Sequence, residues 1–385
     1  MIIAGDTSGD LHGAKLVRNM RKKNNSLFFC GIGGHELRDA GVRLLLDTSS
    51  LSVVGVTEIF SKLPHFLRGI LSAGCLLKIL HPDLLILVDF PGFNLPFSAI
   101  AKRYNMQILY YIGPQVWAWR KSRVKKIRRR IDHMAVILPF EEDFYKHHRV
   151  PATFVGHPLL DDHPIPAQAP AAISDIDTPI IGLLPGSRDR EIARHLPVML
   201  QTAEILTERM NTVRFIISRA PSVNPRAFEQ IIKRHIRCAE FRIETDGVHK
   251  IFRQSVLCVV ASGTATLQAA LYGIPMVIMY KVSCLSYWVG KALVRGVDYI
   301  GLANLIAGRG IVPELIQNEA TPENISETVL KMLNDGELLE AIRRDLIDLH
   351  HKLGGAGASE RAADIALSMI GSGNEAEAQP MGQRI

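Results

Sequence analysis

The stretch VVASGTATLQAALYGIPMVIMY, residues 259–280, decides the fold. An apolar run stops at Ser262-Gly263-Thr264, an Ala- and Leu-rich helical pattern follows at once, and a second apolar run, PMVIMYK, comes next. Continuously apolar strands separated by a helix are typical of parallel sheets, because such sheets are covered on both faces. The stretch therefore predicts a strand, a helix and a second, parallel strand.

The same alternation recurs along the whole chain. Each short apolar run leads into a Gly- or Pro-containing turn and then a helical pattern; the other runs are MIIAG, SLFFCGIGG, LLILVDFPG, QILYYIGP, HMAVILPF, PIIGLLPGS and RFIISRAP. This order predicts the α/β class with doubly wound parallel sheets. The runs are numerous enough for two such sheets, so we expect two Rossmann-like domains that face a cleft.

The chain length and one change in composition predict two domains joined by a linker. A chain of 385 residues is too long for one small core and fits two domains of ordinary size. Residues 156–179 are rich in Pro and Ala and lack periodicity, which is typical of an interdomain linker. We predict a first domain over 1–160, a linker over 161–178, a second domain over 179–345, C-terminal helices over 346–371 and a flexible tail over 372–385.

Composition excludes several classes of protein. Hydrophobic content of 47% and charged content of 22% are those of a folded globular protein, not of a disordered one. The five cysteines show no C-x-x-C spacing and mostly lie in apolar strings, so we expect reduced core residues and no zinc or disulfide framework. The opening MIIAG lacks the pattern of a secretory signal, which favours a protein that is not exported.

Two segments of the first domain suggest a surface partner. The net charge of +7 favours anionic partners, and 120–130, RKSRVKKIRRR, holds eight basic residues next to Trp117 and Trp119. This combination fits nucleic acid, a lipid surface, or a solvated basic helix over core tryptophans. Residues 60–80 are unusually apolar but too interrupted to span a bilayer, so they form either a buried helix or one that dips into a membrane surface.

Two turns of the second domain are typical of phosphate sites. Ser262-Gly263-Thr264 stands where a helix begins, and the N–H groups and dipole of a helix start attract phosphate oxygens. In GLLPGSRDREI, residues 182–192, a second such turn adds Arg188, whose fork of donors suits a diphosphate. Each turn also fits plain helix capping. Because both lie in one domain, they could hold one diphosphate together.

The first domain offers its own turns. AGDTSGDLHGA (4–14) is Gly-rich but no Walker loop, and GIGGHE (31–36) has Glu36 where a dinucleotide fingerprint needs glycine, so NTPase and nicotinamide activities lose support. Asp89 ends an apolar strand in LLILVDFPGFN, where a carboxylate is either an acceptor for turn N–H groups or a general base. The D-x-D of SDIDTP lies in the linker, so we predict no metal site.

Taken together, eight motifs in order resemble those of the lipid-A-disaccharide synthase family, which are inverting glycosyltransferases of the two-domain GT-B type: AGDTSGDLHGA, VDFPGFN, PQVWAWR, ILPFE, FVGHPLLD, LLPGSR, ASGTATL and NLIAGR. The resemblance runs from residue 4 to 345. It implies transfer of diacylglucosamine from UDP-2,3-diacylglucosamine to 2,3-diacylglucosamine 1-phosphate, which gives the β-1,6-linked lipid A disaccharide 1-phosphate and UDP. It implies no metal or other cofactor, and a cytoplasmic enzyme peripheral on the inner face of the inner membrane.

The resemblance also assigns residues. It implies that Asp89 is the base, with Arg188 and Asn304 as further catalytic residues. UDP would lie on Gly186, Ser187, Arg188, Ser262, Gly263, Thr264 and Gln268, and the first-domain side of the cleft would include Ser8, Gly9, Asp10, His12, Asn94 and Arg309. The implied partners are the two acylated sugars and the inner-membrane lipid surface, with no nucleic acid; a homodimer is left open.

Three positions depart from the family's pattern. Gln268 stands where the family has Glu, Asp6 replaces a usual Glu, and Ala303 replaces a usual Pro. An amide accepts hydrogen bonds without charge assistance, so Gln268 predicts weaker binding of UDP.

Other functions stay open on the same residues: a UDP-sugar 2-epimerase, an N-acetylglucosamine transferase acting on a polyprenyl-linked muramyl peptide, and a non-catalytic nucleic-acid-binding protein that uses 110–130.

Overall fold

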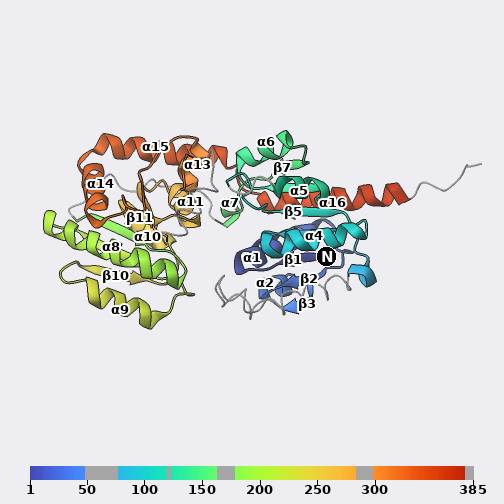
Figure 1. The fold of residues 1–385 in the computed structure, drawn as a ribbon, viewed down its shortest axis with the longest axis horizontal. Coiled ribbons are helices and arrows are strands. Elements are labelled where there is room, and N and C mark those ends of the chain that lie inside the picture. Colours follow the sequence, from blue (N-terminus) through green and yellow to red (C-terminus); the bar gives the residue numbers. More distant parts are fainter. Residues whose placement is uncertain (48–76, 119–122, 163–177, 283–297, 378–385) are drawn as a thin grey trace, which may run out of the picture. The chain divides into compact units, whose positions relative to one another are not determined.

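The computed structural model describes residues 1–47, 77–118, 123–162, 178–282 and 298–377. The chain forms two compact units, Met1–Asp162 with Leu353–Ile385 and His163–Lys352 (Figure 1). Several sequence predictions lie outside the described residues: 60–76 of the apolar segment, Trp119 with 120–122 of the basic segment, and 163–177 of the linker with its D-x-D.

Within the described residues, the first unit holds a seven-stranded sheet of order β3-β2-β1-β4-β5-β6-β7, and every pairing is parallel. The order reverses between β1 and β4, which is the switch point where ligands bind in open α/β sheets. The strands are β1 (Ile2–Ala4), β2 (Cys30–Gly33), β3 (Arg43–Asp47), β4 (Leu85–Val88), β5 (Ile108–Tyr111), β6 (His133–Val136) and β7 (Ala152–Phe154).

Helices cover both faces of this sheet. Leu85 and Leu87 of β4 belong to one hydrophobic cluster, whereas Ile86 and Val88 belong to another. Because neighbouring side chains of a strand point to opposite faces, the two clusters are two cores, as a doubly wound sheet requires. The helices are α1 (Thr7–Lys23), α2 (His35–Asp39), α4 (Pro91–Arg103), α5 (Val124–Arg130), α6 (Pro139–His147), α7 (Leu159–Asp162) and α16 (Ala358–Glu377).

The described part of the second unit holds a six-stranded parallel sheet of order β10-β9-β8-β11-β12-β13, with its switch point between β8 and β11. The prediction of two parallel-sheet α/β domains is confirmed. The strands are β8 (Ile180–Leu184), β9 (Arg214–Ser218), β10 (Phe241–Glu244), β11 (Leu257–Ala261), β12 (Met276–Tyr280) and β13 (Glu314–Ile316); the helices are α8 (Asp189–Arg209), α9 (Pro225–His235), α10 (His249–Gln254), α11 (Thr264–Leu271), α13 (Leu302–Ala307), α14 (Pro322–Asn334) and α15 (Gly336–Lys352).

The C-terminal helix returns to the first unit, where α16, red in Figure 1, packs against α1. The Asp161 carboxylate caps it, accepting from the N–H groups of Gly357 (2.7 Å), Ala358 (3.0 Å) and Ser359 (3.0 Å). The predicted group of C-terminal helices over 346–371 is thus divided, since 346–352 ends α15 in the second unit. Helix also continues to residue 377, inside the predicted tail, and the first two residues of the predicted linker belong to α7.

Two further sequence predictions, on the cysteines and on membrane-spanning segments, can be compared with the structure. Cys30 and Cys258 are buried as predicted, whereas Cys238 is exposed, because it lies in the turn between α9 and β10. There the Glu204 carboxylate accepts from the Cys238 N–H (3.1 Å) and fixes the turn at the surface. Among the described residues, no helix has the length and apolar character needed to cross a membrane.

Candidate active site

The turns after β1 and β4 meet at the switch point of the first sheet. Gly5 follows β1, and a Cβ atom there would lie 2.0 Å from Cδ1 of Phe90, which follows β4. Only glycine allows this close approach, so the two turns pack directly against each other. The packing places Asp6 and Asp89 at the same edge of the sheet.

Asp89 and Phe90 both have left-handed backbones, with φ of +43° and +44°. Such conformations are uncommon for residues with side chains and persist only where the surroundings hold them. Here α4 begins immediately afterwards, at Pro91, so the strand changes direction within two residues. The two strained residues turn the chain sharply at Asp89, which the sequence predicts to be the base.

Hydrogen bonds hold this turn on three sides. The Asp89 N–H donates to the carbonyl of Tyr111 (3.1 Å) at the end of β5. The Asp89 carbonyl accepts from Tyr110 Oη (2.6 Å) and from Asn94 Nδ2 (2.7 Å). Asn94, fully buried in α4, also donates to the carbonyl of Val88 (3.1 Å). Asn94 is therefore placed as a residue that positions Asp89.

The surroundings tune the carboxyl group of Asp89. Burial, and after it the neighbouring Asp6 carboxylate, raise its pKa to about 6, against the hydrogen bond from the Phe90 N–H, which lowers it. A carboxylate with a pKa near neutrality is still ionised at pH 7 and is more basic than an exposed one. The geometry and the pKa together suit a general base.

The residues of the 4–14 turn divide into exposed and structural ones. Asp6 caps α1 by accepting from the Gly9 N–H (2.7 Å), and Ser8 is exposed on the first turn. Asp10, by contrast, is buried and accepts from the N–H groups of Gly34 (2.6 Å) and Glu36 (3.0 Å), which start α2. Its carboxylate joins α1 to α2, and the structure gives it a structural role.

His12, the remaining predicted residue of this turn, is half-buried on α1 and acts electrostatically on His157. Burial, and then His12, lower the pKa of His157 to about 3. His157 Nδ1 accepts from the Leu159 N–H (3.2 Å), so the neutral form of the ring stabilises the local backbone through this hydrogen bond.

In the second unit, the turn after β8 is organised by a glutamate. Gly186 has φ of +118°, and a Cβ atom there would lie 2.5 Å from Oε2 of Glu191. The Glu191 carboxylate accepts from the Ser187 N–H (3.0 Å) and from Arg188 Nη1 (3.1 Å). The Arg188 side chain is 75% exposed, so its guanidinium lies on the surface of the turn, where α8 begins.

The turn after β11 lies beside it, because β8 and β11 pair in register. Gly263 is the N-cap of α11, which begins at Thr264 as predicted, and both residues are exposed. No atom lies within 4 Å of a Cβ built at Gly263. Gln268 follows one helical turn after Thr264 and is half-buried. The structure thus brings the two predicted phosphate turns to one edge of one sheet.

Asn304 and Arg309 both lie in the second unit, where each is held by contacts within that unit. The Asn304 amide is buried; its Nδ2 donates to Val312 O (2.8 Å) and Glu314 Oε1 (2.7 Å), and its Oδ1 accepts from the Ile311 N–H (2.8 Å). Arg309 does not lie on the first-domain side: it belongs to the second unit and pairs with Asp345 (2.6 Å). We assign Asn304 to holding the loop that follows α13.

Glu141 is a buried carboxylate at the edge of the first sheet that the sequence motifs did not single out. It is 1% exposed, and Trp117 Nε1 donates to its Oε1 (2.9 Å). Trp117 is accordingly a core residue, one of the alternatives left open for the aromatic segment. The motif ILPFE carried a signal, since a Glu in the first turn after Pro139 reaches back to the chain before the helix.

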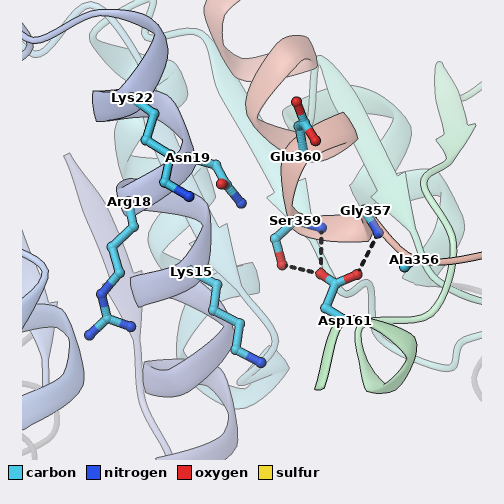
Figure 2. A pocket seen from close by; sticks show the side chains of 9 residues that line it. All are labelled: Lys15, Arg18, Asn19, Lys22, Asp161, Ala356, Gly357, Ser359 and Glu360. Atoms are coloured by element: carbon cyan, nitrogen blue, oxygen red, sulfur yellow. Dashed lines mark hydrogen bonds between the residues drawn. The ribbon is translucent and has the colours of Figure 1, made fainter. Parts of the chain in front are cut away.

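A cavity of about 350 Å³ lies elsewhere in the first unit, and Figure 2 shows its two walls. Lys15, Arg18 and Lys22 line one wall from α1, and Asp161, Ser359 and Glu360 line the other; Lys15 points toward Asp161, whereas Arg18 points away and pairs with Glu36 (3.4 Å). None of the predicted site residues lines this cavity. Among the described residues, no cluster of three histidine, cysteine or acidic side chains could hold a metal ion.

Relatives match almost the full chain. Residues 1–369 match the family model described as lipid-A-disaccharide synthetase. Lipid-A-disaccharide synthases of Syntrophus aciditrophicus and Geobacter sulfurreducens are 44% and 42% identical; each comparison covers 96% of this chain and 97% of the relative.

Solved structures share the fold at low identity. A putative UDP-N-acetylglucosamine 2-epimerase from Listeria monocytogenes has a TM-score of 0.61 at 13% identity, covering 100% of this chain and 99% of that chain. CalG4, the calicheamicin glycosyltransferase, has a TM-score of 0.59 at 15% identity, covering 98% and 99%. These likenesses support the GT-B fold and do not favour an epimerase activity.

The order of the motifs, the two switch-point sites and the relatives over nearly the whole length agree with one another. The chain belongs to the lipid-A-disaccharide synthetase family of glycosyltransferases.

Proposed function

We propose that the chain transfers 2,3-diacylglucosamine from its UDP carrier to 2,3-diacylglucosamine 1-phosphate, with inversion, to form a β-1,6-linked disaccharide 1-phosphate and UDP. The family supplies the reaction class, and one observation carries the chemistry. That observation is Asp89, a carboxylate on a strained turn at the switch point of the first sheet, whose pKa is raised to about 6.

In this proposal Asp89 accepts the proton of the acceptor's 6-hydroxyl as that oxygen attacks the anomeric carbon of the donor. The new carbon–oxygen bond forms as the bond to the diphosphate breaks, and UDP leaves with the electron pair. A carboxylate with a pKa of about 6 is a stronger base than an exposed one and is still mostly ionised at neutral pH. Asn94 and Tyr110 support the step by holding the Asp89 carbonyl.

The donor's diphosphate would bind to the second unit, on the turns 186–188 and 262–264. Helix starts attract phosphate through their N–H groups and dipoles, and α8 and α11 both begin at these turns. The exposed guanidinium of Arg188 would exchange Glu191 for a phosphate oxygen and stabilise the departing UDP. Gln268, one turn along α11, would accept from the ribose hydroxyls. These are preorganised dipoles and a fixed cation, so the proposal requires no metal ion.

We further propose that the first unit docks on the cytoplasmic face of the inner membrane, where both acylated substrates reside. At the end of the 60–80 segment, Ile79 is 76% exposed although it is strongly apolar. On α5, Lys125 and Arg128 are exposed while Val124 and Ile127 are buried, so the cations point outward. Exposed apolar side chains and outward-pointing cations on the same unit suit an anionic lipid surface.

The test is incubation with UDP-2,3-diacylglucosamine and 2,3-diacylglucosamine 1-phosphate in detergent micelles without added metal, followed by mass spectrometry. The proposal expects the disaccharide 1-phosphate and an equal amount of UDP. A parallel reaction with UDP-N-acetylglucosamine should give neither epimer nor transfer product. Epimerisation of that sugar, or no disaccharide from the acylated pair, would overturn the proposed function.

A further inference from the structure

Glu141 is a buried carboxylate surrounded by neutral donors. Its Oε1 accepts from Trp117 Nε1 (2.9 Å), and its Oε2 accepts from the N–H groups of Leu138 (3.1 Å) and Ile137 (3.3 Å). In the part of the chain that the structure describes, Glu141 forms no ion pair with a lysine, arginine or histidine. A buried charge without a cation opposes folding, even where hydrogen bonds satisfy its oxygens.

The ionised form of Glu141 therefore costs stability at neutral and alkaline pH. Burial raises its pKa from the ordinary 4.5 to about 7, against the effect of its three hydrogen bonds. A carboxyl group whose pKa is higher in the folded state destabilises the fold as the pH rises through that range. Capping the start of α6 occupies only Oε2 of Glu141, so the hydrogen bond of Oε1 to Trp117 points to a further role.

Helix α6 holds the segment 114–117, Pro-Gln-Val-Trp, at both of its ends. Trp117 is bonded to Glu141 at one end, and Tyr145 Oη donates to the carbonyl of Pro114 (3.2 Å) at the other. Glu141 and Tyr145 are four residues apart and so share one face of the helix. The Trp117 ring also packs edge-on against Phe140, with centroids 4.9 Å apart.

The same segment is joined to the turn of Asp89. It follows Ile112, a β-branched residue with φ of +59°, which is a rare and strained conformation. The residue before that, Tyr111, accepts the backbone N–H of Asp89 through its carbonyl (3.1 Å). A shift of the segment 114–117 would thus act on the backbone of Asp89 through two intervening residues, Gly113 and Ile112.

We propose that Glu141 is a positioning residue for the transferase reaction: through Trp117 it fixes the segment 114–117, and through Tyr111 this segment fixes the backbone of Asp89. The inference rests on the proposed function, in which Asp89 is the base. Small displacements of a catalytic group reduce turnover strongly, because the reacting atoms must be held in line.

The variant Glu141→Gln tests the inference with almost no change in shape. Glutamine has one oxygen and one amino group, so either Trp117 or the N–H groups of 137 and 138 must face a donor instead of an acceptor. The matched control is Glu142→Gln on the same helix, which replaces a carboxyl group by an amide in the same way. The Glu142 carboxylate accepts from the Phe154 N–H (3.1 Å) and pairs with Lys146 (2.5 Å), away from Trp117.

Two readouts are compared for both variants. Amide hydrogen exchange of the peptide over 111–118 should be faster in Glu141→Gln than in the wild type and unchanged in Glu142→Gln. In transferase assays, Glu141→Gln should lower kcat at least about tenfold, while KM for the UDP-linked donor stays within about twofold, because the donor binds to the second unit. Trp117→Phe, which keeps the ring and removes the donor, should show the same pattern and serves if Glu141→Gln fails to fold.

The outcomes separate this inference from the proposed function. Unchanged exchange over 111–118 in Glu141→Gln, or faster exchange with unchanged kcat, would overturn the positioning role. A wild-type chain that makes no disaccharide would overturn the proposed function instead, and the exchange experiment would still report whether Glu141 holds the segment.

Discussion

Asn94 Nδ2 donates to the carbonyl oxygen of Asp89 over 2.7 Å, from the first turn of the helix that Asp89 precedes. The buried amide spans the strained turn and ties the end of β4 to the start of α4. The position of the proposed base is therefore set by its backbone.

Asn94→Ala should reduce both stability and turnover. It removes a donor to the carbonyl of Val88 and one of the two donors to the carbonyl of Asp89, which keeps Tyr110 Oη; the loss of these two buried hydrogen bonds costs about 1–3 kcal/mol. We expect that loss in urea unfolding, with kcat lowered at least about tenfold as the turn relaxes. The control is Ser98→Ala, which removes a buried bond to the Leu95 carbonyl on the same helix. Equal turnover in the two variants would contradict a positioning role for Asn94.

The pH profile of kcat/KM should show Asp89 as the ionised base. With a pKa of about 6, the carboxylate is lost as the pH falls, so the rate should fall about tenfold per pH unit below that value. Asp6→Asn keeps an N-cap acceptor for the Gly9 N–H but removes the like charge that raises this pKa. The acidic limb should therefore move to lower pH. A limb that stays in place, or moves to higher pH, would show that Asp6 does not tune Asp89.

Gln268→Glu should strengthen the binding of UDP. A carboxylate accepts from ribose hydroxyls with charge assistance, and such bonds are about twice as strong as neutral ones. We expect Kd for UDP to fall about three- to tenfold in calorimetry, with the unfolding midpoint of the free protein unchanged. Unchanged or weaker binding would mean that this position of α11 does not contact the ribose.

The buried His157 should make the fold sensitive to acid. Its pKa is about 3 in the folded chain and about 6.5 when unfolded, so between these values the unfolded state takes up a proton that the folded state does not. The free energy of unfolding should fall by up to about 1.4 kcal/mol per pH unit as the pH drops from 6.5 toward 3. His157→Asn, which retains an acceptor for the Leu159 N–H, should show a shallower slope in urea unfolding from pH 7 to pH 4. Identical slopes would contradict the assignment.

The sequence predicts the central strands of both sheets but misses their edges. The unpredicted strands β3, β7, β10 and β13 are the outermost strands of the two described sheets. Edge strands are exposed on one side, so they lack the continuous apolar runs on which the prediction rests. None of the residues of β3, β10 and β13 is buried. The return of α16 to the first unit was equally hidden, because its cap, Asp161, is distant in sequence.

The candidate site likewise has features that the sequence predicts and features that it does not. Turns at strand ends are visible in the sequence because glycine, proline and polar residues follow an apolar run, and Asp89, Gly186 and Ser262 all lie at switch points as such turns predict. What a side chain contacts is decided by partners far along the chain. The sequence therefore does not predict the hydrogen bonds through which Asn304 and Asp10 organise the fold, and Glu141 passes unnoticed.

The central claim is that Asp89 is the base of a transferase acting on two acylated sugars. The direct measurement is the single-turnover rate of disaccharide formation at pH 8 by the wild type and by Asp89→Asn, with UDP binding to both measured by calorimetry. We expect Asp89→Asn to bind UDP normally and to form the disaccharide at least about 100-fold more slowly, a loss typical of a missing general base. A rate within about threefold of the wild type, at equal UDP affinity, would contradict the claim.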